Sequence, residues 1–315
     1  MPAVLAHDFF AQDAFGSALE SVDLRTSDER DAFLVGAQGP DPLFYLLIPP
    51  LEEFRKLGSR MHHEGPSSLL VAMRRAVEAL GEDDRSIGRA YLAGFVCHYL
   101  LDRAVHPLVE FWSQGICQAG VRDLDARDLD AVHAEVERDF DEMVLFVKRN
   151  QTATTYRAYE QTLVAREEVL NSIGKVYFSA AVAKIAEGEP TAVRVFPIAV
   201  NCYRTALRLM YSPHGMKARL VGGLERLVLH ERHAVSQSMA YRVRAEGTSV
   251  YENADHRPWR NPFTDEIRHE SFWDLYNGVL AQAGPAIATV LDPEFDREAA
   301  KALTHGLNFS GDPVE

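Results

Sequence analysis

The segment CHYLLDRAVHP, residues 97–107, decides the fold. The positions around it, from Phe95 to Val105, are apolar on almost every side of a helix, and such a helix belongs in the interior of a helical protein. His98 and Asp102 are four residues apart, so they point the same way. A lone buried carboxylate is costly, so Asp102 needs a positive partner or a metal ion. The structural alternative is a buried His–Asp hydrogen bond that only orients the helix.

His106 follows Asp102 by another four residues, but Pro107 comes directly after it. The residue before a proline is disfavoured in the helical region, so this helix is predicted to end near Val105 or His106. A separate helix is predicted over 107–117. His106 would then lie at a helix end, where it could cap the helix or reach a neighbouring ion.

Apolar residues spaced by threes and fours form a stripe along residues 129–147, which predicts a half-buried helix. His133, Glu137 and Asp141 form a parallel row one position beside that stripe. A His and a Glu one turn apart can offer two metal ligands from one rigid element. The alternative is a solvated row of charges, with Arg138 and Lys148 nearby.

Three shorter segments carry further candidates: His7 in LAHDFF, Asp41 in GAQGPDPLFY and His62 in MHHE. Asp41 lies in a Gly-Pro/Asp-Pro turn, where an Asp that makes an Asx turn is the ordinary structural alternative. His62 ends a run with apolar residues spaced by threes and fours, which favours an inward position. Its neighbour His63 is expected to be more exposed.

Helical periodicity continues along most of the chain, and no period-2 segment competes with it. The chain is therefore predicted to be one helical domain over 1–315, in which 1–150 carries the motifs and 151–315 adds further helices. The irregular segment 246–270 is predicted to be a connection or a lid. The other predicted helices cover 51–62, 67–81, 86–105, 126–149, 155–171, 173–187, 192–210, 214–243, 271–289 and 295–305.

Composition limits the classes of partner. The formal net charge of −13 disfavours nucleic acid and anionic lipid surfaces. The three cysteines are far apart and are expected to be free thiols in a reducing compartment. The start MPAVLAHDFF has no basic residue and too short an apolar run for a secretory signal, and no run of apolar residues is long enough to span a membrane. We therefore expect a cytoplasmic protein.

Together, these segments resemble the zinc-dependent phospholipase C family, which includes the amino-terminal domain of glycosylphosphatidylinositol-specific phospholipase D. The resemblance runs in order through LAHDFF, GAQGPDPLFY, MHHE, GFVCHYLLDRAVHP and HAEVERDFD. It implies an all-α fold, a multi-helix bundle of the phospholipase C/P1 nuclease type around a metal cluster. Two or three zinc ions are implied, although Mn²⁺ or Fe²⁺ also suits such ligands.

Carried over by position, the resemblance implies three metal sites. The implied ligands are Asp41, His62, His98 and Asp102 for the first ion, His106, His133 and Glu137 for the second, and His7 with a bridging Asp102 for the third. Asp41 would also be the catalytic residue that orients or deprotonates water. Secreted members complete the third site with their processed first residue, and here Asp141 or Asp8 could take that place.

The resemblance implies hydrolysis of a phosphodiester by metal-activated water, with a small phosphodiester or a phospholipid-like molecule as substrate. One alternative is an S1/P1-like nuclease or a nucleotide phosphodiesterase. The other is a non-catalytic helical module that retains a structural metal. A nucleic-acid partner is disfavoured because the sequence has no basic strip interleaved with aromatic residues.

Overall fold

The computed structural model describes residues 4–47, 51–120, 123–182, 193–211 and 238–315. Most of these residues are helical, and the strands in the described part of the chain are two short segments, β1 (Trp259–Arg260) and β2 (Ile267–Arg268). The prediction of an all-α fold is therefore confirmed. Within the described residues, no helix combines the length and the apolar character needed to span a bilayer.

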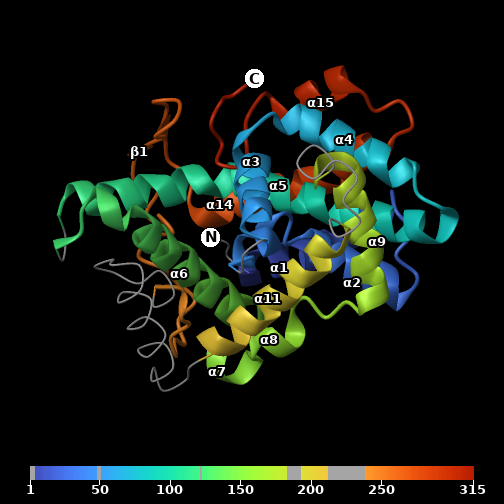
Figure 1. Cartoon of the computed structure of the whole chain (residues 1–315). Coiled ribbons are helices and arrows are strands. Elements are labelled where there is room, and N and C mark those ends of the chain that lie inside the picture. The colour runs from blue at the N-terminus through green and yellow to red at the C-terminus, as the bar shows by residue number, and fades with distance from the viewer. Residues whose placement is uncertain (1–3, 48–50, 121–122, 183–192, 212–237) are drawn as a thin grey trace.

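The helix α5 (Glu82–Gln118) crosses the whole width of the molecule (Figure 1). Every residue from Ala90 to Asp102 is buried, as the apolar pattern on all sides of this segment predicts. The helices α1 (Val4–Ala18), α2 (Ser27–Gly36), α6 (Leu129–Arg149), α9 (Glu167–Tyr177) and α14 (Phe272–Leu291) pack around it.

The prediction that this helix ends near Val105 or His106 is wrong, because α5 continues through Pro107 to Gln118. A proline inside a helix leaves the carbonyl four residues earlier, here that of Arg103, without its usual donor. The segment around Gly311 packs directly on this place: a Cβ on Gly311 would lie 2.8 Å from the Arg103 oxygen. Tertiary packing therefore covers the interrupted turn and keeps the helix continuous.

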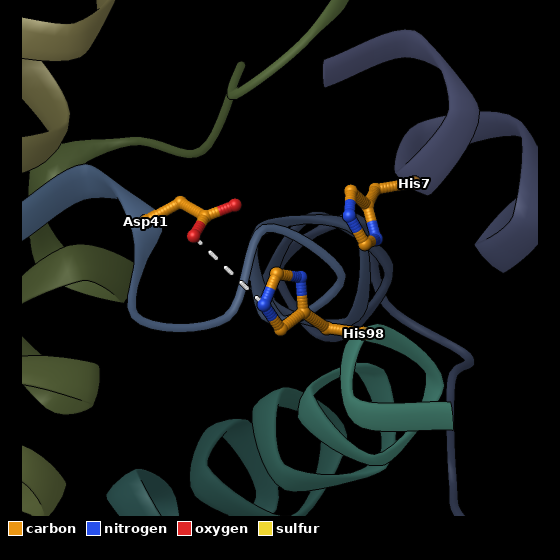
Figure 2. A group of neighbouring side chains, drawn as sticks. All are labelled: His7, Asp41 and His98. Carbon is orange, nitrogen blue, oxygen red and sulfur yellow. Dashed lines mark ion pairs between the residues drawn. The ribbon is translucent and has the colours of Figure 1, made fainter. Parts of the chain in front are cut away.

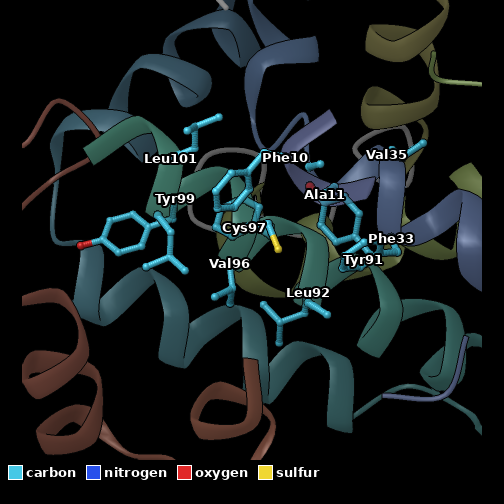
Figure 3. Close-up of a cluster of buried hydrophobic side chains, with 14 of the residues drawn as sticks. Phe10, Ala11, Phe33, Val35, Tyr91, Leu92, Val96, Cys97, Tyr99 and Leu101 are labelled. Atoms are coloured by element: carbon cyan, nitrogen blue, oxygen red, sulfur yellow. The ribbon is translucent and has the colours of Figure 1, made fainter. Parts of the chain in front are cut away.

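The helices α2 and α5 approach each other backbone to backbone. A Cβ on Gly36 would overlap the carbonyl oxygen of Tyr91, and a Cβ on Gly94 would overlap that of Phe33. Figure 3 shows the apolar side chains that fill the space beside this crossing, with Phe10 of α1 among them. The close approach matters for function, because the turn that carries Asp41 begins where α2 ends.

Most other predicted helices are present, with shifted ends. They are α3 (Glu52–His63), α4 (Pro66–Glu78), η3 (Ala126–Asp128) before α6, the π-helical turn η4 (Phe178–Val182) after α9, α11 (Val195–Met210) and α15 (Arg297–Thr304). The prediction of one helix over 155–171 is wrong, because this stretch is divided among α7 (Ala153–Tyr156), α8 (Ala158–Gln161) and the start of α9. The short helix η1 (Asp41–Tyr45) was not predicted. The predicted break between 171 and 173 is wrong, because α9 runs through it. Residues 212–237, most of the predicted helix 214–243, lie outside the described residues.

The irregular segment 246–270 is held against the body of the protein. The buried Trp259 donates its indole N–H to the carbonyl oxygen of Glu270 at 3.1 Å. On the preceding stretch, Arg242 and Arg244 form ion pairs with the buried carboxylate of Asp139 on α6. These contacts favour a fixed connection over a lid.

Candidate metal centre

Asp102 stands at the centre of a cluster of histidines. Along α5, His98, Asp102 and His106 follow one another at intervals of four residues, and only 4% of Asp102 is exposed. Its Oδ1 lies 3.0 Å from Nε2 of His7 and 3.6 Å from Nε2 of His106. Its Oδ2 lies 3.2 Å from Nε2 of His98 and 3.8 Å from Nε2 of His62. One carboxylate is thus shared among four imidazoles.

Asp41 enters the cluster from the turn between α2 and α3. Its Oδ1 lies 3.0 Å from Nε2 of His62 and 3.9 Å from Nε2 of His98. Its Oδ2 is buried without a hydrogen-bond partner. Figure 2 shows Asp41, His98 and His7 approaching one another from three separate segments. The turn therefore brings the Asp41 carboxylate to the histidines, which goes beyond the role of an Asp that only makes an Asx turn.

Glycine 39 is required in this turn for two reasons. Its φ of +49° lies in the left-handed region, and a Cβ there would overlap the imidazole ring of His98. The carbonyl oxygen of Gly39 accepts hydrogen bonds from Tyr91 at 3.2 Å and Tyr177 at 3.1 Å. Helices α5 and α9 therefore fix the turn that presents Asp41.

A second group lies beside the first, between α5 and α6. Oε1 of Glu137 lies 3.2 Å from Nε2 of His133 and 3.3 Å from Nε2 of His106. Nδ1 of His133 faces Oε1 of Glu110 at 3.0 Å. The sequence reasoning missed Glu110, although it continues the row 98, 102, 106 by four residues, because the helix was predicted to stop before it.

Backbone carbonyls fix the orientation of several rings. Three histidines place Nδ1 against a backbone carbonyl oxygen. His62 faces Gly58 at 2.7 Å, His98 faces Ala37 at 3.1 Å and His106 faces Phe309 at 2.9 Å. With the proton on Nδ1, the lone pair of each Nε2 points toward the carboxylates. Where such a lone pair faces a carboxylate oxygen in a buried space, either a proton on the ring or a metal ion has to lie between them.

The donor set fits divalent cations such as zinc. The possible ligand atoms form three groups, and within each group they all lie within 4.8 Å of one another. The groups are His7, Asp41 and His98; His62, His98 and Asp102; and His106, His133 and Glu137. Two ligands of a tetrahedral zinc lie about 3.3 Å apart, similar to most of the N–O spacings in the cluster. The buried Nδ1 of His7 and Nε2 of His98 have no hydrogen-bond partner. Such atoms are suited to metal ligation.

No protein-family model matches the chain. Nor does any curated protein or solved structure. The geometry of the cluster therefore has to be interpreted from its own residues.

The eight predicted ligands are thus brought together, but their grouping differs in part from the expectation. His7 lies with Asp41 and His98 in one group, and its Nε2 also faces Asp102. Asp141 is occupied elsewhere: it accepts hydrogen bonds from Ala6 N and from the hydroxyl of Tyr241, both at 2.7 Å. It thus stabilises the beginning of α1, which carries His7.

A pocket of about 450 Å³ opens onto the cluster. Its lining combines the candidate ligands with a few other side chains: Asp41, Phe44, Ser59, His62, His63, Asp102, His106, Glu110, Asp130, His133, Glu137 and Ser310. None of the described residues of 246–270 is among them, so the prediction that this segment covers the site gains no support.

The C-terminal segment also builds the site, which no pattern in the sequence indicated. The ring of Phe309 packs against the imidazoles of His62 and His98, with centroids 5.1 and 5.7 Å apart. Its backbone N donates to the carbonyl oxygen of His62 at 3.1 Å, and its carbonyl oxygen faces His106. All three candidate metal groups thus contain a histidine that contacts this one residue near the end of the chain.

Replacing Asp8 with asparagine is expected to stabilise the metal-free protein above neutral pH. Burial raises the pKa of the Asp8 carboxyl to about 7, despite a hydrogen bond from Gln12 at 2.7 Å. Between pH 4 and 7 the folded protein keeps a proton that the unfolded chain has lost, so the free energy of unfolding falls as pH rises. Asparagine removes this penalty of up to about 4 kcal/mol.

Thermal unfolding between pH 4 and 8 measures the effect. The advantage of Asp8→Asn should grow up to pH 7 and then level off, whereas Asp23→Asn at an exposed position should follow the wild type. A constant difference between Asp8→Asn and wild type across this range would contradict the prediction.

Proposed function

We propose that this protein is a metal-dependent hydrolase that cleaves phosphodiester bonds in the manner of a zinc-dependent phospholipase C. The observation that supports this most is the convergence of His7, Asp41, Asp102, His133 and three further histidines with Glu137, from separate helices, around shared carboxylates. The order and types of these residues are those that the resemblance implies. The donor atoms suit two or three zinc ions, with Mn²⁺ or Fe²⁺ as other candidates.

When bound, such ions would lower the pKa of a coordinated water and attract phosphate oxygens. The chain's own residues would hold them and shape the surroundings. Asp102 would bridge groups, because both of its oxygens face imidazoles. Asp41 is the candidate catalytic residue: Oδ1 faces His62, while the unpartnered Oδ2 can orient water or accept its proton.

The pocket favours a small substrate. Its volume of about 450 Å³ suits a head group or a small phosphodiester, and Phe44 offers an apolar wall. No Lys or Arg occurs among the described lining residues, and Asp130 adds negative charge. A long nucleic acid usually requires a track of basic and aromatic side chains. We therefore place a small phosphodiester or a phospholipid-like molecule ahead of a nuclease substrate.

Metal content and turnover together test the proposal. Protein purified without a histidine tag or chelator would be analysed for metals, then assayed with bis(4-nitrophenyl) phosphate, phosphatidylcholine vesicles and single-stranded DNA. Bound zinc with hydrolysis of either of the first two substrates supports the proposal. Preferred cleavage of DNA would favour the nuclease, and bound zinc without turnover would favour a structural metal site. Absence of bound metal after zinc addition would refute the hydrolase.

Zinc binding at pH 7 is expected to release about one proton or more per chain. Burial alone would lower the pKa of His106, but Asp102 and Glu137 raise it to about 9, so the metal-free ring is protonated at pH 7. A ring that binds metal through Nε2 must lose that proton. Calorimetric titrations in two buffers with different ionisation enthalpies count the protons; identical heats in both would contradict the assignment of His106.

A further inference from the structure

We infer that Glu110 is a positioning residue that strengthens metal binding by His106, His133 and Glu137, an inference that rests on the proposed function. The imidazole of His133 lies between two carboxylates. Its Nδ1 faces Oε1 of Glu110 at 3.0 Å, and its Nε2 faces Oε1 of Glu137 at 3.2 Å. Glu110 therefore fixes both the tautomer and the rotation of the ring, so that Nε2 is presented to the ion.

This arrangement distinguishes His133 from the other described candidate histidines. Nδ1 of His62, of His98 and of His106 faces a neutral backbone carbonyl, and Nδ1 of His7 has no hydrogen-bond partner. A carboxylate at Nδ1 carries a full negative charge and makes the imidazole a stronger donor to a cation. The negative charge of Glu110, which is not itself a ligand, thus adds to that of the group formed by His106, His133 and Glu137.

Glu110 lies beside the more exposed of the candidate histidines. The side chains of His106 and His133 are 15% and 16% exposed, whereas those of His62 and His98 are 8% and 0% exposed. We call His106, His133 and Glu137 the outer group. Water and competing ligands reach it through the pocket, so an ion bound there would be lost more easily. A carboxylate behind one ligand offsets that disadvantage.

The continuity of α5 makes the contact possible. Glu110 lies one turn after His106 on the same helix, beyond Pro107, and opposite His133 on α6. If α5 ended near Val105 or His106, as the sequence predicted, the side chain of residue 110 would not share a face with His106. Gln114, one further turn along, donates to Oε2 of Glu110 at 3.4 Å and helps to hold the carboxylate in place.

The test compares zinc affinities of wild type, Glu110→Gln and His133→Ala by competition with a chromophoric chelator. Glutamine keeps an acceptor for Nδ1 but removes the charge. His133→Ala identifies which bound equivalent belongs to the outer group. We expect Glu110→Gln to weaken that equivalent by about 10- to 100-fold and to leave the others unchanged. Glu82→Gln, exposed at the start of the same helix, is the matched control.

Two further readouts separate positioning from a general structural role. The melting temperature of the metal-free Glu110→Gln protein should stay close to wild type, and the visible spectrum of its Co²⁺ form should change only in the part that His133→Ala removes. Unchanged affinity of every equivalent would overturn the inference alone, as would equal weakening of all equivalents with a lower melting temperature. A wild type that binds no zinc would overturn the proposed function and this inference with it.

Discussion

On the proposed function, Asp102→Asn is expected to remove most of the bound metal and to lower the rate of phosphodiester hydrolysis by at least about 100-fold. Both oxygens of Asp102 face imidazoles, from His7 and His106 on one side and from His98 and His62 on the other. Asparagine keeps the size of the side chain but offers one neutral acceptor and places an amide N–H₂ among the ring nitrogens. Elemental analysis and the rate with bis(4-nitrophenyl) phosphate measure the two effects.

Folding has to be checked beside the metal content. Although burial opposes ionisation, His106, His98 and His7 hold the pKa of the Asp102 carboxyl well below its usual range, so the metal-free protein also loses ion pairs in the variant. Circular dichroism should therefore show a helical but less stable protein. Asp83→Asn, an exposed substitution on the same helix, is expected to retain all metal and activity. A fully metal-loaded Asp102→Asn protein would show that this row is structural.

Gly39→Ala is expected to lower both stability and metal content. The left-handed backbone at φ +49° costs a residue with a Cβ about 1–2 kcal/mol. The added methyl group would also overlap the ring of His98, which is held by the carbonyl of Ala37 and cannot easily move. Overpacking of a buried site adds about 1–3 kcal/mol, so the total is about 2–5 kcal/mol.

Gly120→Ala separates the two causes. Gly120 also has a left-handed φ, +63°, but a Cβ there would meet no atom within 4 Å. The melting temperature of the Gly120→Ala variant therefore reports the cost of the left-handed backbone alone, and the zinc content of this variant should equal that of wild type. If both variants lose the same stability and both keep their zinc, the contact between Gly39 and His98 does not position the site.

Much of the helical architecture follows from local sequence. The apolar pattern around His98 predicted a central helix, and residues 90–102 are indeed buried. The interval of four residues predicted that His98 and Asp102 share one face, and the two side chains do face each other. His106, predicted at a helix end, lies on the same unbroken helix and faces the same carboxylate. Helix α2 was not among the predicted helices. The sequence does carry a signal for its start, because Thr26 and Glu29 have the spacing of a capping box, which the structure forms.

What the sequence by itself determined is the helical class and the rows of His and carboxylate residues, because helical periodicity depends only on neighbours along the chain. Tertiary structure decided the rest. Packing of the Gly311 segment on Pro107 keeps α5 intact, so that Glu110 reaches His133. Phe309 and the tyrosines that hold Gly39 come from distant segments. Such contacts leave no local pattern, because they arise only when elements far apart in sequence pack together.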